Sequence, residues 1–282
     1  MPDLELNRVV WTESFDWSEE GEEWSEWWGD TPAFWAGAIW PRIHAFLPTA
    51  SVLEIGPGYG RWTQYLQCLC DHLTIVDMAP NCIDHCRQRF AHATNITYQV
   101  NDGNSLDLPD QSIDFVFSFD SLVHAPDQVL AGYLAQLRNI LRPSGLAFIH
   151  HSNLGAHRIS SRLSHRLPKG LQPFLVKSGL VPAEVHWRDE TASAARFREH
   201  CESAGLSCVS QEIISWQDGH FPIDAISLVS MPGSQWDRPL RVTRNLLLAN
   251  EAKRMVEMYS HHSFSKALGR KQGGTAAPDN VY

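Results

Sequence analysis

Short apolar runs alternate with segments of helical spacing through most of the chain. The apolar runs have the length of strands and lie near residues 51–56, 72–77, 95–100, 113–119, 145–151, 206–216 and 224–231. Between them, apolar residues recur every three to four positions near residues 61–70, 79–91, 126–141 and 191–204. This alternation predicts an α/β fold whose seven-stranded sheet is mostly parallel and carries helices on both faces. The link 217–222 is too short for a crossover helix, so we expect the last strand to run antiparallel.

The first 50 residues are rich in tryptophan and predict a helical addition in front of the sheet. Trp24, Trp27 and Trp28 lie at positions i, i+3 and i+4, which places them on one face of a helix. Such a stripe can bury the helix against the neighbouring domain, or it can form a lid over a ligand pocket. Both interpretations stay open from the sequence.

The chain beyond residue 231 turns basic and predicts one more helix, over Leu240–Tyr259. Its apolar stripe could cover the sheet edge or a partner subunit, so a homodimer is one expected arrangement. Residues 270–282 have the composition of a disordered end. We therefore expect a helical, Trp-rich N-terminal lid (1–50), a central domain (51–231) with an insertion (155–190), and a C-terminal helix with a flexible tail (232–282).

The composition is that of a soluble globular protein, with 20% charged residues and a net charge of −9. This balance argues against broad nucleic-acid binding, which needs a basic face. No apolar run approaches the ~20 residues of a membrane span, and the acidic N-terminal stretch is unlike a signal peptide. We therefore expect a cytoplasmic protein without a nucleic-acid or membrane partner. Cys82, His85 and Cys86 lie within one helical turn, but no second pair completes a tetrahedral zinc set, so no metal is expected.

The first predicted strand ends in three glycines at alternate positions, Gly56, Gly58 and Gly60, and a helical segment follows them. Glycine suits such a turn because a ligand can approach the main chain with no Cβ in the way. Dinucleotide-binding folds use the same device with the spacing G-x-G-x-x-G, but here Arg61 takes the sixth position. The turn indicates a ligand-binding loop without selecting the ligand.

Polar residues after the next two strands narrow the choice of ligand. Asp77 ends the second predicted strand, where a carboxylate can accept hydrogen bonds from both hydroxyls of a ribose. The segment Asn101-Asp102-Gly103 directly follows the third strand. Together with Glu54 before the loop, the series from about residue 50 to 231 resembles the class I (Rossmann-like) S-adenosylmethionine-dependent methyltransferases.

This resemblance implies a Rossmann-like fold, S-adenosyl-L-methionine as the cofactor and S-adenosyl-L-homocysteine as the product. In such enzymes the loop holds the cofactor, the acid after the second strand binds the ribose, and residues after the third strand hold the adenine. The implied cofactor contacts are Glu54, Gly56, Pro57, Gly58, Tyr59, Gly60, Trp62, Asp77, Met78, Asp102, Gly103 and Phe119.

Two strand ends beside the expected cofactor carry candidate bases. The segment from Asp120 to His124 is similar to the acid-to-histidine stretch of glycoside and quinone-type O-methyltransferases, in which the histidine acts as the base. His150 and His151 end the fifth strand and face opposite sides, so one of them can point into the pocket. We expect this to be His151, because it lies farther toward the carboxyl end, where those relatives commonly have an acid. The catalytic candidates are His124, His151 and Asp120, and a divalent metal on them is the weighed alternative.

The insertion at 155–190 interrupts the alternation and is expected to cover the mouth of the site. Arg158, Arg162 and Arg166 recur every four residues, which places them on one helical face. That face is either solvated or recognises a phosphate or carboxylate of the substrate. Substrate contacts are expected at Trp28, Arg158, Arg162 and Arg188.

These observations predict an S-adenosylmethionine-dependent O-methyltransferase that acts on a hydroxyl of a small molecule with histidine general-base assistance. A sugar or a glycosylated natural product is the first expectation, because base-like histidines and an Arg-bearing insertion suit a polyol or an anion. An N- or C-methyltransferase of a small metabolite stays open, as does an NAD(P)-dependent oxidoreductase on a similar sheet. A cofactor-binding partner without activity is a third alternative, although such proteins usually lose the polar residues around the methyl group.

Overall fold

The computed structural model describes residues 3–26, 29–159, 174–175, 178, 188–216 and 221–262. Two predicted substrate residues, Trp28 and Arg162, lie outside the described residues. So do most of the predicted insertion and the predicted flexible tail.

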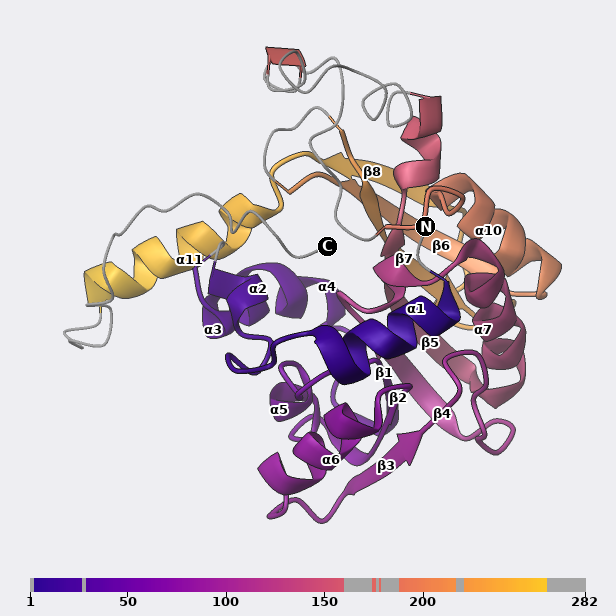
Figure 1. Ribbon diagram of the computed structural model, residues 1–282. Coiled ribbons are helices and arrows are strands. Elements are labelled where there is room, and N and C mark those ends of the chain that lie inside the picture. Colours follow the sequence, from indigo (N-terminus) through magenta and orange to yellow (C-terminus); the bar gives the residue numbers. More distant parts are fainter. Residues whose placement is uncertain are drawn as a thin grey trace.

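One eight-stranded sheet forms the centre of the molecule (Figure 1). Its strands follow the order β3-β2-β1-β4-β5-β7-β6-β8. Their bounds are Thr49–Ile55 (β1), Cys70–Asp77 (β2), Ile96–Val100 (β3), Ile113–Ser118 (β4), Leu141–Ser152 (β5), Ser207–Ile214 (β6), Asp224–Ser230 (β7) and Arg241–Asn245 (β8). β7 runs antiparallel to both β5 and β6, and the other neighbours pair parallel. The predicted α/β fold, with the last of its seven strands antiparallel, is confirmed.

β8 was not predicted. The helix expected from Leu240 instead begins at Ala249 (α11, Ala249–His262), and residues 241–245 pair parallel with β6 at the sheet edge. The neighbouring β-branched residues Val242 and Thr243 favour a strand, and the exposed position of the edge explains why the segment is polar.

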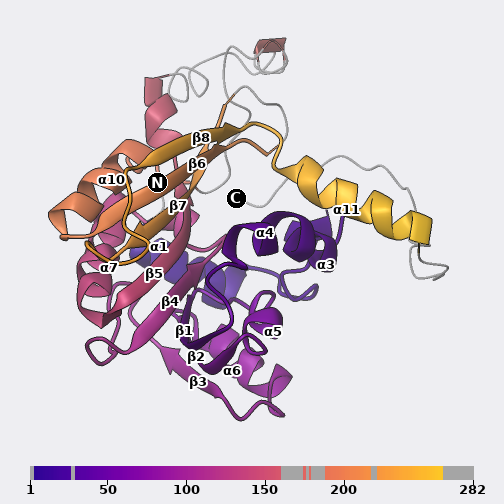
Figure 2. The ribbon, with the colours of Figure 1, turned by 180° about the vertical axis from the view of Figure 1, so that it is seen from behind.

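Helices cover both faces of the sheet (Figures 1 and 2). On one face, α7 (Asp127–Ile140) and α10 (Ala194–Ser203) pack against strand residues that include Ile149. On the other face, Phe148 packs with a second set of helices. This set consists of α3 (Thr31–Phe34), the π-helical turn η2 (Trp35–Ile39), α4 (Trp40–Ile43), α6 (Pro80–Arg89) and α11. Side chains alternate along a strand, so a strand buried on both faces serves both cores.

The remaining helical pieces are short. α1 (Leu4–Val9) begins after Asp3, whose Oδ1 accepts a hydrogen bond from Leu6 N at 2.7 Å. The others are η1 (Val10–Ser14), α2 (Glu23–Glu26), α5 (Thr63–Leu66), η3 (Leu122–His124) and η4 (Leu154–His157). The helix predicted over 61–70 is limited to α5, because the glycine turn continues to residue 62 and β2 already begins at Cys70.

Arg42 of α4 joins the N-terminal helices to the sheet edge and to α11. Its Nη2 and Nε donate to the two carboxylate oxygens of Glu212 on β6, at 2.6 and 2.7 Å. Its Nη1 donates to Oε2 of Glu251 on α11 at 2.7 Å. Asn245, at the end of β8, donates to both carboxylates at 2.9 and 2.7 Å. Three separate parts of the chain meet at this guanidinium.

Candidate functional site

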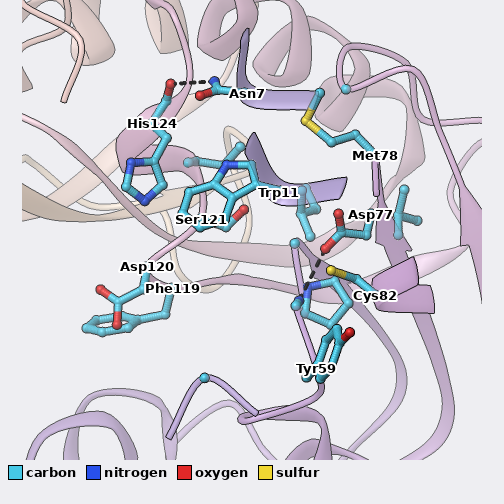
Figure 3. A pocket seen from close by; sticks show the side chains of 18 of the residues that line it. Asn7, Trp11, Tyr59, Asp77, Met78, Cys82, Phe119, Asp120, Ser121 and His124 are labelled. Atoms are coloured by element: carbon cyan, nitrogen blue, oxygen red, sulfur yellow. Dashed lines mark hydrogen bonds between the residues drawn. The ribbon is translucent and has the colours of Figure 1, made fainter. Parts of the chain in front are cut away.

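A cavity lies at the carboxyl ends of β1, β2 and β4, beneath the N-terminal segment (Figure 3). The structure brings most of the predicted cofactor residues together in its wall, namely Gly56, Pro57, Gly58, Tyr59, Trp62, Asp77, Met78, Gly103 and Phe119. Asp120 and His124 line it as well, whereas Glu54, Gly60, Asp102 and His151 do not.

The glycine loop passes very close to the turn that follows β4. Gly56 has φ +71°, and a Cβ at this position would lie 1.8 Å from Oγ of Ser121. Its backbone conformation disfavours other residues and its surroundings leave no room for a side chain. The loop therefore presents bare main chain to the cavity, which is the surface that a nucleoside-like ligand requires.

Asp77 holds the loop in place from the end of β2. Its Oδ2 accepts a hydrogen bond from Gly58 N at 3.2 Å, and its Oδ1 accepts one from Ala79 N at 2.9 Å. Burial raises the pKa of Asp77 to about 6, although these backbone donors act in the opposite direction. The carboxylate lies in the cavity wall, where it can accept further hydrogen bonds.

Asp102 was predicted to hold the adenine, and in the structure it lies outside the cavity wall. Its Oδ1 accepts hydrogen bonds from Asn104 N and Ser105 N at 2.9 and 2.6 Å, so it closes an exposed turn. Its neighbours Asn101 and Gly103 line the cavity instead. An Asx turn and a ligand contact give the same sequence pattern, which is why Asn101 was missed.

Glu54, another predicted cofactor residue, also lies outside the cavity wall, beneath the loop. Thr63 Oγ1 donates to Glu54 Oε2 at 2.6 Å, and Oε1 is buried with no hydrogen-bond partner among the described residues. Burial raises the pKa of Glu54 to about 8, since the one donor from Thr63 does not offset the loss of solvent. The residue stabilises the turn as a neutral carboxyl.

The N-terminal segment supplies one whole wall of the cavity, and most of its contacts were missed. The ring of Trp17 stacks on Tyr59 of the glycine loop at 4.5 Å and 6°, and Tyr59 stacks in turn on His85 of α6 at 3.8 Å. Further lining residues from this segment are Leu4, Asn7, Trp11, Glu20, Gly21 and Trp24. The sequence offered only the aromatic content of residues 11–28 as a signal.

His124 lies in η3 at the cavity wall, directly beneath this segment (Figure 3). Asn7 Nδ2 donates to the carbonyl oxygen of His124 at 2.9 Å. The ring of Trp11 lies 5.1 Å from the His124 ring, centroid to centroid. The predicted base therefore reaches the cavity while the N-terminal segment fixes its backbone and covers its ring.

His151 was expected to point into the cavity, but neither it nor His150 lines the wall. His151 is fully buried on the far face of the sheet, where it stacks on Phe197 at 4.0 Å and its Nε2 lies 2.8 Å from Ser227 Oγ. Burial lowers the pKa of His151 to about 4. His150 points to the opposite side of β5 and lies beside Asp120, which does line the cavity, with its ring stacked on Phe119 at 4.4 Å.

Asp120 links the cavity wall to His150. Its backbone has φ +62°, a conformation that Asp tolerates better than most residues. Arg61 Nη2 donates to Asp120 Oδ2 at 2.6 Å, and His150 Nδ1 lies 3.2 Å from Oδ1. Burial raises the pKa of Asp120, but the positive charges of Arg61 and His150 outweigh it and hold the value at about 2. Asp120 is thus ionised at neutral pH.

The two predicted substrate arginines that the structure describes lie outside the cavity wall. Arg188 donates through Nη2 to Oδ2 of Asp224 at 2.9 Å and is half-buried. Arg158 is exposed and lines a separate hollow between the starts of α7 and α10. Arg61 does line the cavity, although the sequence marked it only as the residue that replaces the last glycine of the G-x-G-x-x-G spacing.

Within the described ranges, no three His, Cys, Asp or Glu side chains are grouped closely enough to hold a metal ion. The residues weighed as a zinc site have other contacts, since Cys86 Sγ donates to Gly58 O at 3.2 Å and His85 stacks on Tyr59. Of the helices that the structure describes, none combines the length and the apolar character needed to cross a membrane.

Residues 52–145 match a family model described as a methyltransferase domain. Phosphoethanolamine N-methyltransferase 1 of Caenorhabditis elegans is 28% identical over 112 residues, which make up 40% of this chain and 23% of that protein. A probable S-adenosylmethionine-dependent methyltransferase of Mycobacterium tuberculosis is 27% identical over 115 residues, or 41% of this chain and 40% of that protein. The chain thus spans less than half the length of these curated relatives.

The fold is similar to that of solved structures. A complex of DhpI with SAH matches with a TM-score of 0.51 and 19% identity, over 81% of this chain and 95% of that chain. At this identity the likeness shows the fold alone. The matched segment contains the glycine loop, Asp77 and the turn after β4, which line the cavity. Residues 52–145 therefore match a methyltransferase-domain family, and the sheet that carries them has a Rossmann-like fold.

Proposed function

We propose that this chain transfers a methyl group from S-adenosylmethionine to a small molecule. The observation that carries the proposal is the bare glycine loop next to Asp77 in one cavity wall. The loop fits close approach of an adenosyl group, and the carboxylate fits its ribose hydroxyls. The G-x-G-x-G spacing favours this ligand over a nicotinamide dinucleotide.

The proposed acceptor group is a hydroxyl, with a sugar or a glycosylated natural product as the first candidate. When bound, the cofactor supplies an electrophilic methyl group. A hydroxyl gains from a base that removes its proton as the oxygen attacks, and His124 is the histidine that the structure describes in the cavity wall. Asp120, with its pKa at about 2, is too acidic for this task, and we assign it to binding.

An amine acceptor is the second candidate. It is supported by the similarity to phosphoethanolamine N-methyltransferase 1. A neutral amine is a nucleophile in its own right, so His124 would then orient the acceptor rather than activate it. A panel that contains both hydroxyl and amine acceptors distinguishes the two candidates.

The N-terminal segment is proposed to act as a lid. Trp17 stacks on the glycine loop and the ring of Trp11 lies against that of His124, which supports a segment that moves aside when the cofactor enters. Once closed, it would keep water away from the reacting groups.

Calorimetric titration with S-adenosylhomocysteine, together with transfer of labelled methyl groups to the acceptor panel, tests the function. We expect the wild-type protein to bind S-adenosylhomocysteine and Asp77→Ala to lose most of that affinity. His124→Ala should lower turnover by about 10²–10⁴-fold while its affinity for S-adenosylhomocysteine stays unchanged. A wild-type protein that gives no heat of binding would overturn the proposal. Equal loss of turnover and affinity in His124→Ala would mark a structural histidine.

A further inference from the structure

A row of alternating charges runs beneath the cavity, across the ends of β4, β5 and β7. It begins with Arg61, whose Nη2 lies 2.6 Å from Asp120 Oδ2. His150 Nδ1 lies 3.2 Å from Asp120 Oδ1, and His150 Nε2 lies 3.4 Å from Asp224 Oδ2. Arg188 ends the row, 2.9 Å from the same oxygen of Asp224. The row joins Arg61, which follows the glycine loop, to Arg188.

Two inner members of the row, His150 and Asp224, have no access to solvent. The side chains of His150 and Asp224 are 0% exposed and that of Arg61 is 5% exposed. Trp216 Nε1 also donates to Asp224 Oδ2, at 2.6 Å. Buried ion pairs of this kind contribute little to stability compared with apolar residues of similar volume, because both partners lose their hydration. Stability alone therefore does not account for the row.

The protonation of His150 follows from its two neighbours. Its Nδ1 lies 3.2 Å from both the backbone N and Oδ1 of Asp120, so a neutral ring would accept from the amide and a charged ring would donate to the carboxylate. Burial lowers the pKa of His150, but the carboxylates of Asp120 and Asp224 outweigh it and raise the pKa. The charged ring, which lies between the two carboxylates, is the form that this environment favours.

The end of the row that reaches the cavity carries both signs of charge. Arg61 and Asp120 line the cavity wall, and the side chain of Asp120 is 19% exposed. Arg61 is held from behind, since its Nη1 donates to Ser25 Oγ at 3.0 Å and its guanidinium carbon lies 4.4 Å from the centre of the Trp62 ring. Each Asp120 oxygen uses one lone pair within the row, so further acceptor positions stay available to a ligand.

The cavity presents Asp77 and Asp120 on opposite sides of the glycine loop (Figure 3). Under the proposed function, on which this inference rests, Asp77 receives the ribose. The opposite end of the cofactor is an α-amino acid, with one ammonium and one carboxylate group. We propose that Asp120 and Arg61 receive this zwitterion, and that His150 and Asp224 are positioning residues that hold Asp120 in place for it.

Two ligands that differ only in this end test the proposal. S-adenosylhomocysteine carries the amino acid, and 5′-methylthioadenosine keeps the adenosyl thioether without it. Asp120→Asn should weaken S-adenosylhomocysteine at least about tenfold, as expected for a lost charge-assisted hydrogen bond, and should leave 5′-methylthioadenosine unchanged. His150→Gln should weaken the first ligand several-fold, with the same selectivity. Isothermal titration of each folded variant gives both dissociation constants.

His151→Gln is the matched control, because His151 neighbours His150, is equally buried and faces away from the cavity. It should lose stability and keep the affinity for both ligands. Equal losses for both ligands in Asp120→Asn, or no loss for either, would overturn the proposal, and Asp120→Asn alone decides it if His150→Gln does not fold. Failure of the wild-type protein to bind either ligand would instead refute the proposed function.

Discussion

Replacing Glu54 by Gln should flatten the pH dependence of stability. Glu54 is buried with one hydrogen bond from Thr63, and its pKa is about 8 in the folded protein against an ordinary 4.5. The folded protein therefore keeps a proton that the unfolded chain releases. The stability that results is complete below pH 4.5 and is lost as the pH rises through about 8.

The size of the effect follows from the difference between the pKa of Glu54 in the folded protein and its ordinary pKa. Between pH 4.5 and 8 the free energy of unfolding should fall by about 1.4 kcal/mol per pH unit, or about 5 kcal/mol in all. For a protein of this length, 1 kcal/mol changes the melting temperature by about 2–4 °C. A change from pH 5.5 to 7.5 should therefore lower the melting temperature by about 5–10 °C through the ionisation of Glu54 alone. Glu54→Gln cannot ionise, so it removes this fall.

Thermal unfolding followed by circular dichroism between pH 5 and 9 gives the two curves. Groups remote from Glu54 that titrate in this range contribute equally to both proteins, so the difference between the curves reports Glu54 and its coupling to Asp77. Glu54→Gln should start below the wild-type protein at low pH, because its buried amide lacks a partner, and should gain on it as the pH rises. Thr63→Val removes the hydrogen-bond donor that favours the ionised form of Glu54, so the loss of stability should extend to higher pH. Parallel curves for Glu54→Gln and the wild-type protein would refute the reasoning.

Three further predictions concern the cavity. The affinity for S-adenosylhomocysteine should fall as the pH drops below about 6, where Asp77 takes up a proton and loses acceptor capacity, and calorimetry on Asp77→Asn should show no such dependence. Gly56→Ala should cost at least about 3 kcal/mol in urea unfolding, since its Cβ would meet Ser121, and Ser121→Gly should recover part of the loss. Trp17→Ala removes the ring stacked on Tyr59 and should speed release of S-adenosylhomocysteine in stopped-flow experiments about tenfold, whereas an unchanged rate would exclude the lid.

The sheet and the glycine loop could be predicted because their signals are local. Apolar runs mark strands buried on both faces, and a turn that needs bare backbone needs glycine. The face of the sheet to which a side chain on such a strand points cannot be predicted in the same way. β5 is buried on both sides from Gly145 to Ser152, so its pattern held nothing that distinguished His150 from His151. The contacts with Asp120 and Asp224 decide the question, and they come from the turn after β4 and from β7.

The missed wall of the cavity has a similar cause. Trp11 and Trp17 lie in short helical and turn segments without a clear period, so the sequence indicated aromatic content but not its position. The position of Asp102 was not predicted for the opposite reason. Its sequence context gave a strong local signal, but that signal belonged to a turn, in which Asn104 N donates to the Asp102 side chain. Arg61 was visible as a charged residue, yet its burial depends on Ser25 and Asp120, which are remote in sequence.

The guanidinium of Arg42 couples the unfolding of the N-terminal helices to the unfolding of α11. It is largely buried, and it holds Glu212 from the sheet and Glu251 from the last described helix at once. If α11 detached, Arg42 and Glu212 would stay buried without the Glu251 carboxylate. Local unfolding of α11 therefore destabilises the N-terminal helices, and unfolding of those helices destabilises α11. The beginning and the end of the described chain should therefore exchange amide hydrogens together, as a single cooperative block at the sheet edge.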